Sequence, residues 1–273
     1  MKIISNVNEL KTYLKKEKKI IGFVPTMGAL HDGHLSLIKT ARKECELLVV
    51  SIFVNPTQFL AGEDLDKYPS RDDADKKICK LAGVDVVFLP QRSDIYGDDE
   101  VSLNAPNVRG FVLEGATRPG HFDGVLTVVN KLFNIVNPDN AYFGKKDAQQ
   151  LNLISLMVKQ LFLDVNIVAV DTVRESDGLA LSSRNIYLSK EERKEALKIS
   201  RSLYMASKMV QKKVYDTHEI KKVMSEILEP LEVGYIEILN REFEVLDNIE
   251  IGNTIVLVEA LVGTTRLLDN IWL

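Results

Sequence analysis

The 273-residue sequence lacks several features that would assign it to a familiar class of protein. Its two cysteines, Cys45 and Cys79, form no CxxC pair and are too few for a disulfide framework. No uninterrupted apolar run approaches the roughly 18 residues of a membrane helix, and the lysine-rich N-terminus lacks the apolar core of a signal peptide. We therefore predict a cytoplasmic protein with reduced thiols and no membrane partner.

A general excess of positive charge is also missing. The formal net charge is -4 at pH 7, so the chain has no basic field of the kind that nucleic-acid binders use. Neither GxGxxG nor GxxxxGK[ST] occurs, which excludes a dinucleotide fingerprint and a P-loop. Hydrophobic residues make up 45% and charged residues 27%, as in a globular protein with a sizeable core. Any phosphate site must then depend on a local concentration of donors and cations.

Strands and helices alternate over residues 1–175. Apolar, β-branched runs predict strands at 20–24, 47–54, 84–89, 140–144 and 165–170. Helical spacing predicts helices at 6–16, 35–42, 123–136 and in two segments that end near 81 and 161. This alternation predicts an α/β fold with a Rossmann-like, doubly wound parallel sheet and helices on both faces. Such sheets bind ligands beyond the carboxyl ends of their strands.

Two stretches of the first domain carry no clear periodicity. Residues 61–75 are polar and charged, and residues 91–122 are rich in Gly, Pro and Asn. A long irregular segment in a compact domain is usually a functional loop or a lid.

The pattern changes after Arg174. A capping box at 189–192 opens a long predicted helix that ends near Lys213, and a second helix spans 217–228. Three apolar stretches at 235–239, 254–260 and 266–269 then predict a small antiparallel sheet. We predict two domains, residues 1–175 and a smaller α+β domain at 176–273.

The stretch Pro25–His34 is the most informative part of the chain. It joins a predicted strand to a predicted helix, and a helix N-terminus with free backbone N–H groups is an anion site. His31 and His34 are spaced to face the same side of the first turn, where they could donate hydrogen bonds to a phosphate as its charge grows. Two histidines near a helix start are also common on plain surfaces. Zinc is a further alternative, but HExxH is absent and only two other histidines, His121 and His218, remain.

The string Pro25–His34 resembles the HxGH signature of the nucleotidyltransferase superfamily and, over its full length, the pantoate–β-alanine ligase family. Four further blocks resemble that family in the same order, namely 53–59 (FVNPTQF), 118–125 (RPGHFDGV), 143–150 (FGKKDAQQ) and 181–185 (LSSRN). Five blocks in order make the resemblance specific. The chain departs from the family at Lys145, where an acidic residue is usual, and at Ala148, where an aromatic one is usual.

The resemblance implies an AMP-forming ligase with two half-reactions. ATP and (R)-pantoate, with Mg²⁺, give pantoyl adenylate and pyrophosphate, and β-alanine then attacks the adenylate to give pantothenate and AMP. It further implies an ATP- and pantoate-binding catalytic domain at 1–175, a C-terminal lid at 176–273, and a homodimer. Its partners would be these small molecules, with no nucleic acid.

The resemblance also assigns site residues, all but Val173 from within the five matching blocks. The predicted catalytic residues are His34, His31, Lys146 and Arg184. Predicted ATP contacts are Met27, Gly28, Ala29, Leu30, His31, Asp32, Gly33, His34, Gly144, Lys145, Lys146, Asp147, Val173, Leu181, Ser182, Ser183 and Arg184. Predicted pantoate or β-alanine contacts are Gln58, Gln150, Asn55 and Arg118, with His121 nearby. No side chain is assigned to a metal, and Gln149 is expected to face solvent.

Other functions share part of this pattern. Another HxGH nucleotidyltransferase, acting on a different small acid or phosphate, would share the histidines but would not need the 55–59 block or the paired glutamines. A class I aminoacyl-tRNA synthetase is disfavoured by the acidic balance of the chain. A nucleotide-sensing binding module would not call for His31, His34, Lys146 and Arg184 together.

Overall fold

The structure is a computed structural model that describes residues 1–60, 62–63, 65, 68 and 71–273. Part of the polar 61–75 stretch thus lies outside the described residues. The chain forms two compact units, residues 1–144 with 149–170, and residues 145–148 with 171–273. The short segment 145–148 groups with the second unit although the chain enters it from a strand of the first, which a single cut in the sequence does not anticipate.

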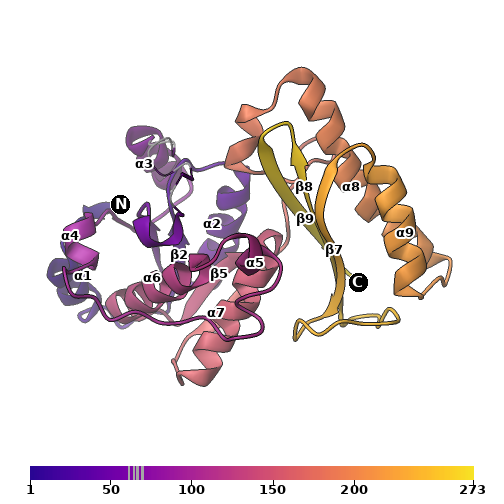
Figure 1. Cartoon of the computed structure of the whole chain (residues 1–273). Helices are drawn as coiled ribbons and strands as arrows, with labels where there is room; N and C mark the ends of the chain where they lie inside the picture. The colour runs from indigo at the N-terminus through magenta and orange to yellow at the C-terminus, as the bar shows by residue number, and fades with distance from the viewer. Residues whose placement is uncertain (61, 64, 66–67, 69–70) are drawn as a thin grey trace. The chain divides into compact units, whose positions relative to one another are not determined.

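The first unit is built on a parallel sheet (Figure 1). Its strands follow the order β1-β4-β3-β2-β5-β6, and every pair is parallel. The strands are β1 (Lys2–Ile4), β2 (Ile21–Thr26), β3 (Leu47–Ile52), β4 (Val86–Phe88), β5 (Asn140–Gly144) and β6 (Asn166–Val170). The predicted doubly wound α/β fold is therefore confirmed, with β1 as an additional edge strand.

Helices cover both faces of this sheet. They are α1 (Val7–Leu14), α2 (Asp32–Glu44), α3 (Asp72–Leu81), α4 (Arg92–Ile95), α5 (Glu114–Thr117), α6 (His121–Val136) and α7 (Ala148–Gln160), with short 3₁₀ turns η1 (Pro56–Gln58) and η3 (Lys145–Asp147). Side chains of α2 and α3 pack on one face with strand residues such as Val24, Val50 and Val87. On the other face α6 packs on β2, where Phe133 meets Phe23 edge to face.

The order of the strands positions the predicted site. Strand β2 lies between β3 and β5, and the chain leaves β2 toward β3 but leaves β5 toward β6 on the opposite side. The right-handed connections of a parallel sheet then send α2 and α7 to opposite faces. Ligands of doubly wound sheets bind at such a reversal, and the HxGH turn follows β2 directly.

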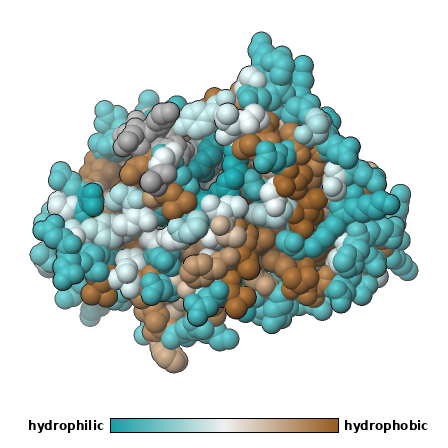
Figure 2. Space-filling model, viewed as in Figure 1, coloured by the Kyte–Doolittle hydropathy of each residue, from teal (hydrophilic) through white to brown (hydrophobic). Residues whose placement is uncertain are grey.

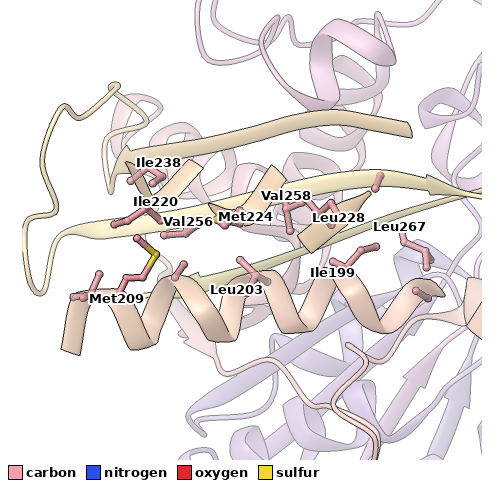
Figure 3. Packing of buried hydrophobic residues seen from close by; sticks show 14 of the residues in the cluster. Ile199, Leu203, Met209, Ile220, Met224, Leu228, Ile238, Val256, Val258 and Leu267 are labelled. Carbon is pink, nitrogen blue, oxygen red and sulfur yellow. The ribbon is translucent and has the colours of Figure 1, made fainter. Parts of the chain in front are cut away.

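The second unit is a three-stranded antiparallel sheet with two helices against it. Its elements are η4 (Ser183–Tyr187), α8 (Lys190–Gln211), α9 (Thr217–Leu228), β7 (Glu232–Asn240), β8 (Thr254–Val262) and β9 (Thr265–Trp272). Figure 3 shows Leu203 of α8 and Met224 of α9 pointing toward Val256 and Val258 of β8. The capping box that opens α8 is present, since Ser189 and Glu192 exchange side-chain-to-backbone hydrogen bonds.

The outward face of α9 is polar. Figure 2 shows a mostly hydrophilic surface over α9, whose buried residues recur with helical spacing. Within the described part of the chain, no helix is both long and apolar enough to cross a membrane.

Candidate active site

The two histidines of the HxGH turn are fixed by backbone hydrogen bonds. His31 is the N-cap of α2, and its Nδ1 accepts from the Gly33 N–H at 3.1 Å. The Nδ1 of His34 accepts from the His31 N–H at 3.3 Å. The ring centroids lie 4.1 Å apart. Because both Nδ1 atoms act as acceptors, each neutral imidazole carries its hydrogen on Nε2, and the turn has two oriented N–H donors at a helix N-terminus.

The backbone that leads into these histidines has an unusual conformation. Gly28 and Ala29 have φ of 85° and 51°, in the left-handed region that costs a residue with a Cβ roughly 1–2 kcal/mol. A Cβ on Gly28 would also lie 3.0 Å from the Ile52 side chain. Glycine is therefore required at residue 28, whereas Ala29 needs compensating contacts.

Asp75 of α3 supplies those contacts. Its two carboxylate oxygens accept hydrogen bonds from the N–H groups of Ala29 and Leu30, each at 2.8 Å, and the residue is 1% exposed. Sequence reasoning missed this residue. Acidic residues in the first turn of a helix usually stabilise the helix dipole, and no local pattern distinguishes Asp75 from its exposed neighbours.

Asn55 and Gln58 lie in a turn that follows β3. Asn55 Nδ2 donates to Gln58 Oε1 at 3.0 Å and to the Gly124 carbonyl at 3.1 Å, while its Oδ1 accepts from the hydroxyls of Thr57 and Tyr96. Both amide hydrogens and both lone pairs of the buried Asn55 are thus used within the protein. The Gln58 amide is oriented with its Nε2 toward the Met27 sulfur at 3.1 Å. This geometry gives Asn55 the task of orienting Gln58.

Arg118 is also engaged within the protein. Its guanidinium makes two hydrogen bonds of 2.6 Å to the Glu63 carboxylate and one of 3.2 Å to the carbonyl of Gln58. His121 lies beside it and its Nδ1 is 2.8 Å from the same carbonyl. Since an Arg nitrogen can only donate, His121 Nε2 is the acceptor and Nδ1 is the donor. Two donors therefore hold the backbone of Gln58, the residue predicted to bind pantoate.

Charge reinforces this cluster. Burial tends to raise the pKa of the Glu63 carboxyl, but hydrogen bonds from Arg118 and the Leu60 N–H outweigh it and hold that pKa below its ordinary value. The pair is largely screened from solvent, with the Arg118 and Glu63 side chains 11% and 23% exposed.

Gly124 allows α6 to approach this turn. A Cβ at this position would lie 2.4 Å from the Thr57 carbonyl oxygen and 2.7 Å from the Gln58 nitrogen, which are backbone atoms that cannot simply rotate away. The glycine is part of the 118–125 block, but a lone glycine within a helical pattern did not reveal this contact.

The two glutamines of α7 differ in a way that corrects one prediction. Gln149, expected to face solvent, is 4% exposed. Its Oε1 accepts from the Glu114 N–H, and its Nε2 donates to the carbonyls of Arg109 and Val112, at 2.8–3.1 Å. The expectation was wrong because Gln149 hydrogen bonds to the long 91–122 loop, whose backbone lacks regular partners. Gln150 is half-buried.

In the second unit, adjacent lysines have different surroundings. Lys145 pairs with Asp171 at 2.5 Å, and its Nζ lies 5.6 Å from the centre of the Trp272 ring. The Nζ of Lys146 is 3.6 Å from Asp147, whose side chain is half exposed. The positive charge of Lys145, which departs from the family pattern, is thus paired with a close carboxylate, whereas the contact between Lys146 and Asp147 is longer.

The Ser182–Arg184 turn is held by a polar network. The Ser182 hydroxyl accepts from the Arg184 N–H, and Asn185 donates to Glu175 at 2.8 Å. Hydrogen bonds, chiefly from Arg193, hold the pKa of Glu175 below its ordinary value. Val173 and Leu181, both predicted ATP contacts, are joined by a backbone hydrogen bond of 3.0 Å.

A cavity of about 660 Å³ opens at the carboxyl ends of strands β1 to β4. Its lining includes the predicted residues Met27, Gly28 and Ala29, together with Asp75 and Arg92. Pockets of this volume accommodate small organic ligands.

Predicted site residues therefore gather within each unit. The first unit contains the HxGH turn, Gly144, Asn55, Gln58, Arg118 and Gln150, and the second contains Lys145, Lys146, Asp147, Val173, Leu181 and Ser182–Arg184. Among the residues that the structure describes, no three His, Cys, Asp or Glu side chains are grouped to hold a metal ion.

Comparison with known proteins points to one family. The family model described as pantoate-beta-alanine ligase matches residues 2–272. A pantothenate synthetase from Sulfurimonas denitrificans is 67% identical and one from Aliarcobacter butzleri is 57% identical, each over the whole of both chains.

Solved structures lead to the same group. A crystal structure of pantothenate synthetase from Thermus thermophilus is 40% identical, covers 99% of both chains and has a TM-score of 0.94. A pantoate-beta-alanine ligase from Francisella tularensis, complexed with beta-gamma ATP and beta-alanine, is 36% identical with a TM-score of 0.82, covering 100% of this chain and 97% of that one. Similarity over the whole chain shows that the chain belongs to the pantoate–β-alanine ligase family.

Proposed function

We propose that the protein joins pantoate to β-alanine with ATP, through a pantoyl adenylate, releasing pyrophosphate and AMP. The observation that carries the proposal is the pair of imidazoles at the N-terminus of α2, whose Nδ1 atoms both accept backbone N–H groups. This arrangement makes Nε2 the donor nitrogen of each ring and places both rings at the positive end of a helix dipole, which favours an anion. Membership of the ligase family supports the identity of the substrates.

The first half-reaction is adenylation. A carboxylate oxygen of pantoate attacks the α-phosphorus of ATP, the bond from that phosphorus to the bridging oxygen breaks, and pyrophosphate leaves with the electron pair. A carboxylate is already a nucleophile, so the barrier lies in positioning and in the charge that develops on the phosphates. His31 and His34 stabilise that charge through hydrogen bonds that strengthen in the transition state.

Pantoate is held by neutral amides. We assign its hydroxyl groups to Gln58 and Gln150, which offer donors and acceptors without a charge that would compete for the carboxylate. Asn55 and Arg118 contribute indirectly, because their hydrogen bonds orient the side chain and hold the backbone of Gln58. Met27, in contact with the Gln58 amide, is assigned to the same substrate region.

Cations and hydroxyls of the second unit bind the nucleotide. Lys146 provides a point charge for the phosphates and Arg184 a planar fork. Ser182 and Ser183 add hydroxyl donors, and Asp147, half exposed, accepts from the ribose hydroxyls. Lys145 contributes through its backbone, since its side chain is paired with Asp171.

In the second half-reaction the amine of β-alanine attacks the acyl carbon. The carbon–oxygen bond to the phosphate breaks, AMP leaves, and the amide nitrogen releases a proton.

Magnesium fits this scheme as a companion of ATP. Mg²⁺ keeps several waters and is commonly bound through substrate phosphates with few protein ligands. The described residues, which offer no three-carboxylate or imidazole cluster, suit that mode. Bound to ATP, the ion would neutralise triphosphate charge. We further propose, from the family resemblance, a homodimer, a lid role for the second unit and a cytoplasmic location.

The order of product release tests the proposal. With ATP, Mg²⁺ and pantoate alone we expect one equivalent of pyrophosphate per site, and AMP only after β-alanine is added. Pantoate labelled with ¹⁸O in its carboxylate should transfer one label to AMP, because the attacking oxygen stays on phosphorus. Pyrophosphate release that does not depend on pantoate, or unlabelled AMP, would refute the scheme.

A histidine variant tests the role of the two imidazoles at the N-terminus of α2. His34→Ala should slow adenylation about 10²–10³-fold, the scale for one lost transition-state donor. His218→Ala, at an exposed histidine of α9, is the matched control and should keep the wild-type rate. Equal rates for both variants would remove His34 from the mechanism.

A further inference from the structure

The C-terminal strand β9 contains a buried asparagine that hydrogen bonds to a predicted phosphate-binding segment. Asn270 is 2% exposed, and its Nδ2 donates to the carbonyls of Lys145 at 3.0 Å and Lys146 at 2.7 Å. Its Oδ1 accepts from the indole N–H of Trp272 at 2.9 Å, which fixes the orientation of the amide. Both amide hydrogens are therefore committed to the backbone of adjacent lysines.

The bonds from Asn270 tie the lysine segment to β9. Residues Lys145–Asp147 form one 3₁₀ turn between β5 and α7, and Asn270 binds the carbonyls of two consecutive residues of that turn. The two bonds from Asn270 fix the orientation of consecutive peptide groups and so set the direction in which the Lys146 side chain leaves the backbone.

The neighbouring residue of β9 holds a second segment. Asp269, also buried, accepts two hydrogen bonds from the Arg174 guanidinium, at 2.6 and 3.0 Å, and Arg174 donates to the Asn270 carbonyl at 3.2 Å. Arg174 lies between Val173 and the turn that carries Arg184. Consecutive residues of one strand thus hold both cation-bearing segments of the second unit.

We propose that Asn270 is a positioning residue for Lys146, and that it acts on adenylation through the backbone of that lysine. The inference rests on the proposed role of Lys146 at the ATP phosphates. A displacement of about 1 Å at a reacting group can cost on the order of 10²-fold in rate. Asn270 touches no substrate in this scheme, so its effect must disappear when the Lys146 side chain is absent.

A double-mutant cycle tests that dependence. The variants are Asn270→Ala, Lys146→Ala and the double variant, each measured by pantoate-dependent pyrophosphate formation in a single turnover. We expect Asn270→Ala to slow the step about 10- to 100-fold, with the KM for pantoate within about twofold of wild type. In the double variant, Asn270→Ala should cause no slowing beyond that of Lys146→Ala alone.

Two further variants separate positioning from stability. Asn270→Asp keeps the size of the side chain and the acceptor for Trp272, but it replaces both donors with an oxygen that the two carbonyls repel, so it should slow the step at least as much as Asn270→Ala does. Asn240→Ala removes another buried asparagine of the same sheet, whose bonds stabilise the β7 turn at Glu244. It should lower thermal stability while the adenylation rate stays within about twofold of wild type. Far-UV circular dichroism reports whether each variant keeps its fold, because the fluorescence of Trp272 would respond directly to the loss of its bond to Asn270.

The outcomes are distinguishable. A wild-type rate for Lys146→Ala would refute the proposed role of that lysine. A strong Lys146→Ala effect with independent, multiplicative effects of Asn270→Ala would overturn the positioning inference alone. The positioning inference would also be overturned if Asn240→Ala slowed adenylation as much as Asn270→Ala, because a loss of stability would then explain both effects.

Discussion

Replacing Asp75 with asparagine should show how the HxGH turn keeps its shape. In the native turn one carboxylate accepts hydrogen bonds from the N–H groups of Ala29 and Leu30, each at 2.8 Å, and Ala29 has a φ of 51°. An asparagine side chain has only one acceptor oxygen, and its NH₂ group would face the second backbone N–H. The substitution therefore removes one charge-assisted hydrogen bond and turns the other into a neutral one.

The size of the effect follows from these bonds. A hydrogen bond to a charged group contributes about 1.5–3 kcal/mol, and a neutral bond about 0.5–1.5 kcal/mol. Losing one and weakening the other should lower the free energy of unfolding by about 2–4 kcal/mol. Because the affected N–H groups directly precede the histidines, the Nε2 donors should also shift, and adenylation should slow about 10²-fold.

Urea unfolding and single-turnover pyrophosphate release measure the two effects. Asp73→Asn is the matched control, since Asp73 lies in the same helical turn, is fully exposed and pairs with Lys76 only at 3.4 Å. It makes the same change in charge and should alter stability by less than about 0.5 kcal/mol. If both variants lost equal stability, the helix dipole would explain the loss. If Asp75→Asn kept the wild-type stability and rate, the turn would not depend on this carboxylate.

Three further predictions concern other parts of the structure. Gly124→Ala should raise the KM for pantoate by about tenfold or more, because its Cβ would press on the Thr57 carbonyl and displace the adjacent turn; steady-state kinetics measure this, and an unchanged KM would contradict it. Although burial tends to raise the pKa of Glu63, Arg118 lowers it, so the stabilisation is present above the ordinary Glu value of about 4.3 and is lost as pH falls through the lower folded value. Glu63→Gln should therefore flatten the fall in unfolding free energy between neutral and acidic pH, and an unaltered slope would argue against it. Burial raises the pKa of Cys79 to about 12, so iodoacetamide at mildly alkaline pH should modify this thiol only in denaturant. Modification of Cys79 in the native protein, detected by mass spectrometry, would contradict this prediction.

Local sequence patterns predicted the fold well because they reflect short-range physics. The alternating apolar runs indicated the parallel strands, and the Ser189–Glu192 capping box indicated the start of α8. Strand β1 was missed since three residues, Lys2–Ile4, carry too little periodicity, and they form a strand only by pairing with β4. Pairing over such a distance depends on the completed sheet.

The candidate site was predictable only in part, for a related reason. Residues that act through local geometry, such as His31 and His34, stand in a motif that can be recognised. Residues that support them bond across long separations, 46 residues from Ala29 to Asp75 and 124 from Lys146 to Asn270. No spacing rule connects such pairs, because the fold alone brings them together.

The supporting residues share a physical requirement. A turn that presents donors to a ligand cannot use them in a regular ladder, so its remaining buried N–H and carbonyl groups need side-chain partners. Asp75 does this for the HxGH turn, and Asn270 for the lysine turn. Gln149 does it for the 91–122 loop, one position before Gln150. Buried polar side chains bonded to turn backbone therefore identify positions where substitution should alter catalysis without touching substrate.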